Sequence, residues 1–183
     1  MKIQSVTVFC GSKPGHQAGF VDQAISLGNA LAKEGIRLIY GGGNKGIMGA
    51  IANAVLAKNG EVTGIIPSLL LEWEAQHEGL TELIVTDTMH ERKKLLYDKA
   101  DVAIVLPGGM GTMDELFEML TWNNLNIHQK KVIILNWEGF YTPLISLLDH
   151  MNTQGFMYDD WRERIIIATD ADDIMNQIND LSE

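Results

Sequence analysis

The segment VAIVLPGGMGTMDE, residues 102–115, joins an apolar run to a cluster of three glycines, a threonine and two acids. The run Val102–Leu106 has the composition of a buried strand, and a helix is predicted to begin at Thr112. Glycines let the backbone approach a ligand closely, and the free N–H groups of a helix start suit a phosphate. Because the acid Glu115 follows one helical turn later, the segment predicts a sugar phosphate whose reacting carbon lies beyond the phosphate.

Short apolar runs alternate with amphipathic stretches along the whole chain. The predicted strands are Ser5–Cys10, Arg37–Tyr40, Glu61–Ile66, Glu82–Val85, Ala100–Leu106, Lys131–Leu135 and Arg164–Ala168. The predicted helices are Ala18–Glu34, Ile47–Asn59, His90–Lys99, Thr112–Asn124, Thr142–Asn152 and Ala171–Asp180. This alternation predicts an α/β fold, a single Rossmann-like, doubly wound domain over residues 1–183. Its sheet is expected to be mainly parallel, with about seven strands and helices on both faces.

The charge and the apolar content of the chain exclude several classes of partner. With 14 Lys and Arg against 24 Asp and Glu, the net charge is −10, so we expect no nucleic acid partner. No apolar run approaches the roughly 20 residues that cross a bilayer, so we expect no membrane partner. The single cysteine, Cys10, rules out an internal disulfide, and no signal peptide pattern precedes the first strand. We therefore expect a cytoplasmic protein.

Three predicted strands end in turns that contain glycine: Cys10-Gly11-Ser12, Gly41-Gly42-Gly43-Asn44 and Pro107-Gly108-Gly109. In a parallel sheet these turns lie along one edge, where ligands bind. The run 41–46 also has the GxGxxG spacing of a dinucleotide site, but it follows the second strand and lacks a correctly placed acid. Two interpretations stay open for it, a tight turn between strand and helix or a contact with a mononucleotide. The pattern supports NAD binding least.

Two adjacent cations are candidates for contact with the ligand. Arg92 lies one turn from Met89 on an otherwise core-facing row, where an arginine usually pairs with an anion such as a phosphate. A ligand contact and a solvated surface position both remain open for Lys93. The histidines show no metal-binding spacing, Cys10 has no partner for a zinc site, and no lysine motif marks a pyridoxal phosphate site. The sequence predicts no metal and no other cofactor.

Two predicted helix starts carry the Thr-x-x-Glu pattern of a capping box. We interpret Thr88–Glu91 as structural. At Thr112–Glu115 the glutamate could complete the helix start, or it could face a ribose while the loop holds the phosphate. One helical turn rises about 5.4 Å, which is similar to the reach from a 5′-phosphate to the far side of a ribose. A simple cap does not need three close glycines, which favours a functional role.

The run PGGMGTMDE, residues 107–115, resembles the PGGxGTxxE signature of the LOG ("lonely guy") family. Members of this family are cytokinin riboside 5′-monophosphate phosphoribohydrolases and are often mislabelled lysine decarboxylases. The similarity covers nearly the whole chain. Further landmarks are Cys10–Ser12, Tyr40–Gly43, Gly46–Gly49, Met89-x-x-Arg92-Lys93 and the stretch 122–131.

The resemblance implies hydrolysis of the N-glycosidic bond of an adenosine-type 5′-monophosphate, with release of the base and ribose 5-phosphate. It implies catalytic roles for Arg92 and Glu115. It also implies a contribution from an upstream glutamate, which matches Glu74, with Glu72 and Glu78 as alternatives in register. The expected substrate-binding residues are Gly11, Ser12, Gly42, Gly43, Asn44, Glu74, Met89, Lys93, Gly108, Gly109, Met110, Gly111, Thr112 and Thr121.

Alternatives remain at the level of function. The same loop could serve a non-catalytic nucleotide sensor or carrier, which would bind a nucleotide without releasing its base. Whether plain AMP or an N6-modified analogue is the substrate is not decided by the residues. The family builds its active site at a dimer interface, so the resemblance implies a homodimer or a higher homo-oligomer, with a small nucleoside monophosphate as the other partner.

Overall fold

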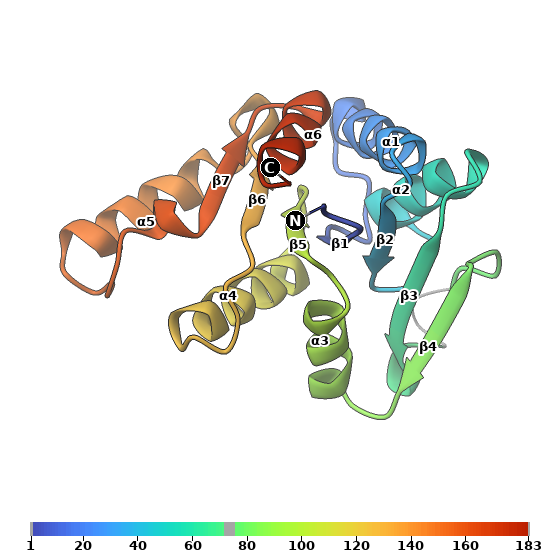
Figure 1. The fold of residues 1–183 in the computed structure, drawn as a ribbon, viewed down its shortest axis with the longest axis horizontal. Helices are drawn as coiled ribbons and strands as arrows, with labels where there is room; N and C mark the ends of the chain where they lie inside the picture. Colours follow the sequence, from blue (N-terminus) through green and yellow to red (C-terminus); the bar gives the residue numbers. More distant parts are fainter. Residues whose placement is uncertain (1, 72–75, 183) are drawn as a thin grey trace.

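A computed structural model of the protein describes residues 2–71 and 76–182. These residues form one sheet of seven parallel strands in the order β4-β3-β2-β1-β5-β6-β7 (Figure 1). The strands are β1 (Ser5–Phe9), β2 (Arg37–Tyr40), β3 (Val62–Pro67), β4 (Glu82–Thr86), β5 (Val102–Val105), β6 (Val132–Leu135) and β7 (Ile165–Ala168). The predicted doubly wound α/β fold is therefore confirmed.

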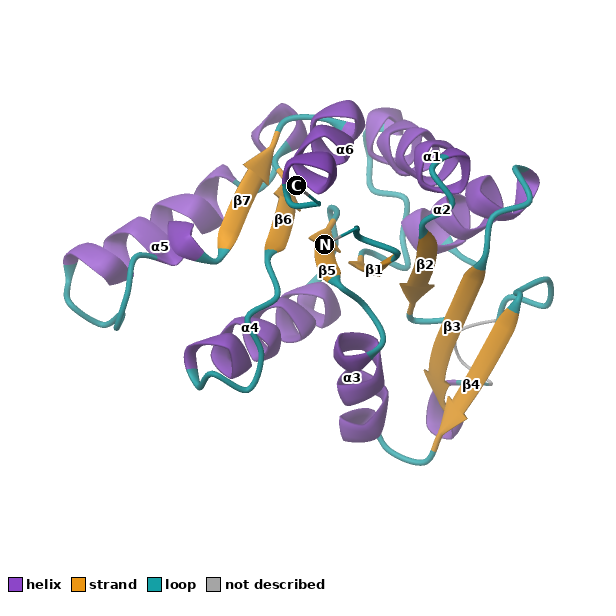
Figure 2. Cartoon of the chain, in the orientation of Figure 1, coloured by secondary structure: helices purple, strands orange, loops and turns teal. Residues whose placement is uncertain are grey.

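Helices cover both faces of the sheet (Figure 2). They are α1 (Ala18–Lys33), α2 (Gly46–Ala57), α3 (Met89–Asp98), α4 (Met110–Asn124), α5 (Thr142–Thr153) and α6 (Ala171–Asp180), with short 3₁₀ turns η1 (Ser68–Leu70), η2 (Trp137–Gly139) and η3 (Trp161–Glu163). Helices α1, α2 and α6 pack on one face, and α3, α4 and α5 pack on the other. In the described part of the chain, no helix is both long and apolar enough to cross a membrane.

The strands carry apolar side chains toward both layers because consecutive residues point to opposite faces. In β5, Val102 and Ile104 join the cluster beneath α1, α2 and α6, whereas Ala103 and Val105 join the cluster beneath α3, α4 and α5. Burial on both faces explains why these strands read as continuous apolar runs instead of alternating ones.

The order of the strands reverses between β1 and β5. From β1 the chain moves outward through β2, β3 and β4, then returns to add β5, β6 and β7 on the other side. Helix α1 follows β1 onto one face, and α4 follows β5 onto the opposite face. The two connections therefore diverge and leave a crevice at the carboxyl ends of β1 and β5, which is the usual ligand position in such sheets.

The predicted element bounds agree with the structure to within a few residues, with one correction that matters for the site. Helix α4 begins at Met110, two residues before the predicted start, and Gly109 is its N-cap. Thr112 therefore lies inside the first turn, so the predicted start at Thr112 was wrong and the less favoured interpretation of Thr112–Glu115 as a capping box is excluded. The structural interpretation of the other box is confirmed, since the Thr88 hydroxyl accepts a hydrogen bond from the Glu91 N–H at 3.1 Å.

Two glycines with positive φ provide a matched test of backbone packing. Gly46 has φ 58° and Gly35 has φ 67°. A Cβ on Gly46 would overlap the backbone of Ser12 and Lys13, whereas one on Gly35 would meet nothing within 4 Å.

We expect Gly35→Ala to lower the free energy of unfolding by about 1–2 kcal/mol, because it forces alanine into the left-handed region. Gly46→Ala adds a backbone overlap, which should raise the loss by a further 1–3 kcal/mol or so. Urea denaturation of both variants measures the difference. Equal losses would contradict close packing between the turns after β1 and β2.

Candidate active site

A cavity of about 470 Å³ opens at the carboxyl ends of the central strands. The turns that follow β1, β2 and β5 all contribute to its wall, as predicted from their glycines. Its described lining residues are Val8, Cys10, Gly11, Ser12, Lys13, Gly15, Phe20, Gly41, Ile47, Met48, Arg92, Pro107, Gly108, Gly109, Met110, Gly111, Thr112, Glu115 and Phe140.

The glycine loop after β5 is held against the turn after β1. The Gly11 N–H donates a hydrogen bond to the Pro107 carbonyl at 3.0 Å. A Cβ on Gly108 would overlap the Thr112 side chain and lie 2.9 Å from the Gly11 nitrogen, so only glycine fits there. By contrast, a Cβ on Gly109 would meet nothing within 4 Å. Gly108 is thus needed for packing, while Gly109 leaves the backbone open.

The start of α4 forms part of the cavity wall. The Met113 N–H donates to the Gly109 carbonyl at 3.1 Å and makes the first hydrogen bond of this helix. The N–H groups of residues 110–112 precede it, and a Cβ on Gly111 would also meet nothing within 4 Å. The positive end of the helix dipole lies at the same place. The wall therefore offers backbone donors and a favourable potential to an anion.

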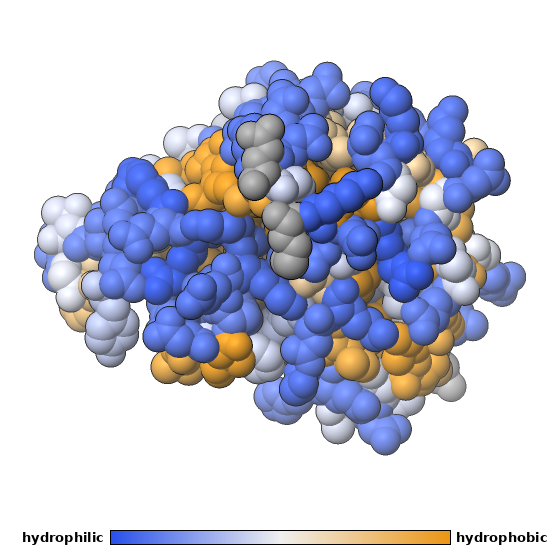
Figure 3. Space-filling model, viewed as in Figure 1, coloured by the Kyte–Doolittle hydropathy of each residue, from blue (hydrophilic) through white to orange (hydrophobic). Residues whose placement is uncertain are grey.

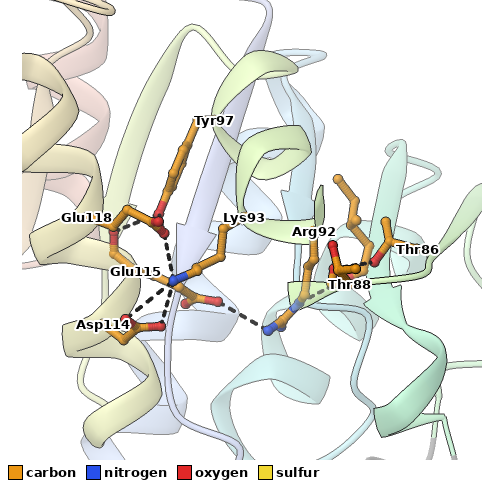
Figure 4. A network of polar contacts seen from close by, with 9 residues as sticks. Thr86, Thr88, Arg92, Lys93, Tyr97, Asp114, Glu115 and Glu118 are labelled. Carbon is orange, nitrogen blue, oxygen red and sulfur yellow. Dashed lines mark hydrogen bonds and ion pairs between the residues drawn. The ribbon is translucent and has the colours of Figure 1, made fainter. Parts of the chain in front are cut away.

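Arg92 reaches the cavity from α3 and is buried, with 6% of its surface exposed. Its Nε donates to the Ile65 carbonyl at 3.1 Å, and its Nη1 lies 3.5 Å from Glu115 Oε1 (Figure 4). A Cβ on Gly41 would overlap the guanidinium, so the glycine after β2 makes room for this arginine. The two predicted catalytic residues thus form an ion pair in the cavity wall, although they come from different helices.

Lys93 lies beside this pair but outside the described lining of the cavity. Its Nζ is 2.8 Å from Glu118 Oε2 and 3.2 Å from Asp114 Oδ2. Burial alone would lower the pKa of Lys93, but hydrogen bonds and the negative charges of Glu118 and Asp114 outweigh it and raise the pKa. The ammonium is therefore charged and held by two carboxylates of α4 in this structure.

Of the turn at residues 41–44, only Gly41 is among the described residues that line the cavity. The Gly42 carbonyl accepts from the His77 N–H at 3.0 Å, and the Gly43 carbonyl accepts from the Tyr40 hydroxyl at 3.1 Å. Gly42 has φ 81°. These hydrogen bonds and the positive φ of Gly42 agree with the first interpretation, a tight turn between strand and helix. Contact of Gly42 and Gly43 with a mononucleotide stays a prediction.

Other predicted substrate-binding residues lie away from the cavity or cannot be placed. Thr121 lies on the exposed side of α4, where its hydroxyl donates to the Phe117 carbonyl at 2.7 Å. Asn44 and Met89 are outside the described lining. Glu74 and the alternative Glu72 lie outside the described residues, and the other alternative, Glu78, is exposed. Their roles in binding stay predictions.

Sequence reasoning missed the aromatic part of the wall. Phe20 from the start of α1 and Phe140 after η2 meet edge to face, with ring centroids 5.3 Å apart. Phe140 follows β6, so the rule that placed the glycine turns along one edge could also have found it. The cavity therefore combines a charged pair with apolar and aromatic side chains.

In the part of the chain that the structure describes, no cluster of three His, Cys, Asp or Glu is arranged to hold a metal ion. Cys10, the single cysteine, lines the cavity and is buried, with 8% of its surface exposed. Burial, together with the negative charge of Glu115, raises the pKa of its thiol well above the ordinary value.

The fold and the site define an α/β protein with a Rossmann-like sheet and a glycine loop at its switch point, where the backbone donors of a helix start line a cavity. A family model described as "Possible lysine decarboxylase" matches residues 48–178. The chain belongs to this family, the LOG family that the signature indicated.

Relatives and a solved structure agree with this assignment. The chain is 44% identical to the cytokinin riboside 5′-monophosphate phosphoribohydrolase of Rhodococcoides fascians, over 92% of this chain and 86% of the relative. It is 40% identical to the cytokinin riboside 5′-monophosphate phosphoribohydrolase LOG of Oryza sativa subsp. japonica, over 98% of this chain and 74% of the relative. The molybdenum cofactor binding protein of Rippkaea orientalis has a TM-score of 0.74 at 24% identity, over 99% of this chain and 98% of that chain. The last likeness shows the fold alone.

The environment of Cys10 leads to a prediction about its reactivity. Because the thiolate is the reactive species, a raised pKa and burial should leave the native thiol unmodified by an aromatic disulfide reagent at about pH 8. The urea-unfolded protein should react fully under the same conditions, and a Cys10→Ser variant gives the blank. Rapid modification of the native protein would contradict the placement of this thiol.

Proposed function

We propose that this protein hydrolyses the N-glycosidic bond of adenosine-type nucleoside 5′-monophosphates and releases the free base and ribose 5-phosphate. The observation that carries the proposal is the Arg92–Glu115 pair, 3.5 Å apart in a cavity that also contains the start of α4. The names of the relatives, which are phosphoribohydrolases of cytokinin riboside 5′-monophosphates, support the same reaction.

The phosphate is proposed to bind at the start of α4. Backbone N–H groups and the helix dipole favour an anion there, and Gly109 and Gly111 leave space for it. Glu115 lies five residues beyond Met110, the first residue of the helix, which at about 1.5 Å per residue is a rise of roughly 7.5 Å. That separation suits a ribose whose 5′-phosphate is at the helix start and whose C1′ faces the carboxylate.

Glycosidic cleavage requires stabilisation of positive charge on the sugar. The bond between C1′ and the base nitrogen breaks through an oxocarbenium-like state, and water supplies the new bond to C1′. Glu115 is proposed to stabilise that charge or to take the proton from the water. Arg92 would hold the phosphate or stabilise the departing base, which leaves with the bonding electron pair and takes up a proton.

The composition of the cavity bears on which base is accepted. Apolar side chains such as Ile47, Met48, Phe20 and Phe140 share the wall with the ion pair. Burial of an apolar substituent against them would be favourable. We therefore infer that an N6-modified substrate with an apolar substituent is preferred over AMP, with AMP as a slower substrate.

A homodimer is the proposed assembly, in a cytoplasmic setting. Met110, Phe117 and Thr121 recur along one face of α4 at helical spacing, and the first two are exposed hydrophobic residues. Leu125 and Ile127 extend this exposed apolar surface, and Figure 3 shows hydrophobic residues over the end of α4. Because Met110 lies in the cavity wall, a second copy on this face would reach the cavity mouth.

The reaction is tested by incubating the protein with AMP and with N6-isopentenyl-AMP and separating the products by chromatography. Glu115→Gln should keep the fold and lower turnover by about 10²–10⁴-fold, the usual contribution of a positioned acid or base. Glu163→Gln, at an exposed site in η3, is the matched control and should behave as wild type.

Two outcomes would count against this function. A Glu115→Gln variant as active as wild type would remove the catalytic assignment. Tight nucleotide binding by the wild-type protein, with no free base formed from either substrate, would favour the sensor or carrier instead.

The assembly is tested by light scattering during size-exclusion chromatography. Phe117→Asp should shift the dimer toward monomer, because a carboxylate on the apolar face of α4 opposes its burial. Ile25→Asp on α1, at a residue of similar exposure on the other side of the sheet, should leave the mass unchanged. Equal masses for all three proteins would exclude this face as the interface.

A further inference from the structure

A polar cluster between α3 and α4 lies beside the Arg92–Glu115 pair, and the proposed reaction assigns no step to it. Lys93 contacts Asp114 and Glu118, and the Tyr97 hydroxyl lies 3.0 Å from Glu118 Oε2. Figure 4 shows the lysine pointing at both acids, with the tyrosine directed at Glu118 from α3. We call these four residues the α3–α4 strut.

The strut is built from residues adjacent to the catalytic pair. Lys93 follows Arg92 in α3, and Asp114 precedes Glu115 in α4. The Tyr97 hydroxyl is also 3.2 Å from the backbone carbonyl oxygen of Glu115. Its one proton serves one acceptor at a time, and the charged carboxylate of Glu118 is the stronger of the two. A rotation of either helix would therefore disturb the strut and the Arg92–Glu115 distance together.

Burial distinguishes the strut from an ordinary surface ion pair. The side chains of Lys93 and Glu118 are 11% and 18% exposed, whereas those of the Lys94–Asp98 pair on the same helix are 64% and 52% exposed. Asp114, at 58%, is the exposed end of the strut. Lysine usually extends its ammonium to water, and an exposed pair contributes little to a fixed geometry. A buried lysine paired with Glu118, which also accepts a hydrogen bond from Tyr97, instead fixes how α3 and α4 face each other.

The strut also balances charge near the catalytic acid. Among the described residues, the charged and titratable groups near Glu115 include Arg92, Lys93, Tyr97, Asp114, Glu118 and the Cys10 thiol, and Lys13 lines the same cavity. Lys93 offsets the acids on either side of Glu115. Without that cation, two further negative charges would disfavour the ionised form of Glu115.

We propose that the α3–α4 strut holds Glu115 opposite Arg92 for catalysis, with Tyr97 and Glu118 as positioning residues, an inference that rests on the proposed function. Neither residue lies in the described lining of the cavity, so neither is expected to contact the substrate. Their effect should therefore appear in turnover and in the charge state of Glu115, and only weakly in substrate binding.

The first experiment removes one hydroxyl. Tyr97→Phe keeps the buried ring, which packs edge to face on Trp122 and Phe9. We expect kcat to fall about tenfold or more, as for small misplacements of catalytic groups, with KM nearly unchanged. Asp98→Asn, which breaks the exposed ion pair of the same helix, is the control and should match wild type.

The second experiment removes one charge. Glu118→Gln takes away a negative charge near Glu115 and frees Lys93 to approach it, and both changes favour the ionised carboxylate. The acid limb of the pH–rate profile should therefore move to lower pH. The Glu115 carboxyl signal in ¹³C NMR, assigned with Glu115→Gln, should also titrate at lower pH. Glu118→Asp retains the charge and should restore the wild-type profile.

These measurements separate failure of the strut from failure of the proposed function. If the wild-type protein releases no base, the proposed reaction is wrong. The NMR titration needs no turnover, so it still shows whether Glu118 affects the charge state of Glu115. An unchanged Glu115 titration in folded Glu118→Gln overturns the strut. So does a Tyr97→Phe enzyme with wild-type kcat. Lower thermal stability with unchanged kcat and pH profile would assign the strut to structure alone.

Discussion

The close approach of the connections after β1 and β5 is the constraint on which the site depends. The Gly11 N–H bonds the Pro107 carbonyl at 3.0 Å, and Gly108 leaves no room for a side chain beside Gly11 and Thr112. From this contact the chain departs onto opposite faces of the sheet through α1 and α4. The crevice between them exists because the connections diverge, and the start of α4 faces it because the glycine loop is so short.

Burial of Arg92 is the second constraint on the site. A buried guanidinium must be paired and hydrogen-bonded, since an isolated buried charge is costly. The Ile65 carbonyl takes one donor, and Glu115 supplies the opposite charge. Gly41 provides the space, so two strands, β2 and β3, and two helices, α3 and α4, determine where this arginine lies. A substrate phosphate can compete for the arginine only by entering the same cavity.

The sequence predicted the architecture well, because apolar runs that alternate with amphipathic stretches admit few other folds. It also predicted that the turns containing Gly11 and Gly108 would lie along one sheet edge, and it identified Arg92 as a candidate for contact with the ligand. It placed the start of α4 too late, because three nearby glycines argue for a loop, whereas Met110 and Gly111 are already helical here. Local propensity is a weak guide where tertiary packing fixes the backbone.

The position of Lys93 could not be read from spacing, because its partners depend on how α3 and α4 pack. From the residues alone, a ligand contact and a solvated surface position are both open for Lys93, and the family resemblance implies contact with the substrate. In the structure Arg92 enters the cavity, whereas Lys93, rotated by one residue on the helix, faces Asp114 and Glu118. One helix thus divides its two cations between Glu115, the proposed catalytic acid, and the acids Asp114 and Glu118. That division explains how the acids Asp114, Glu115 and Glu118, which lie beyond the first turn of α4, can coexist with a loop suited to an anion.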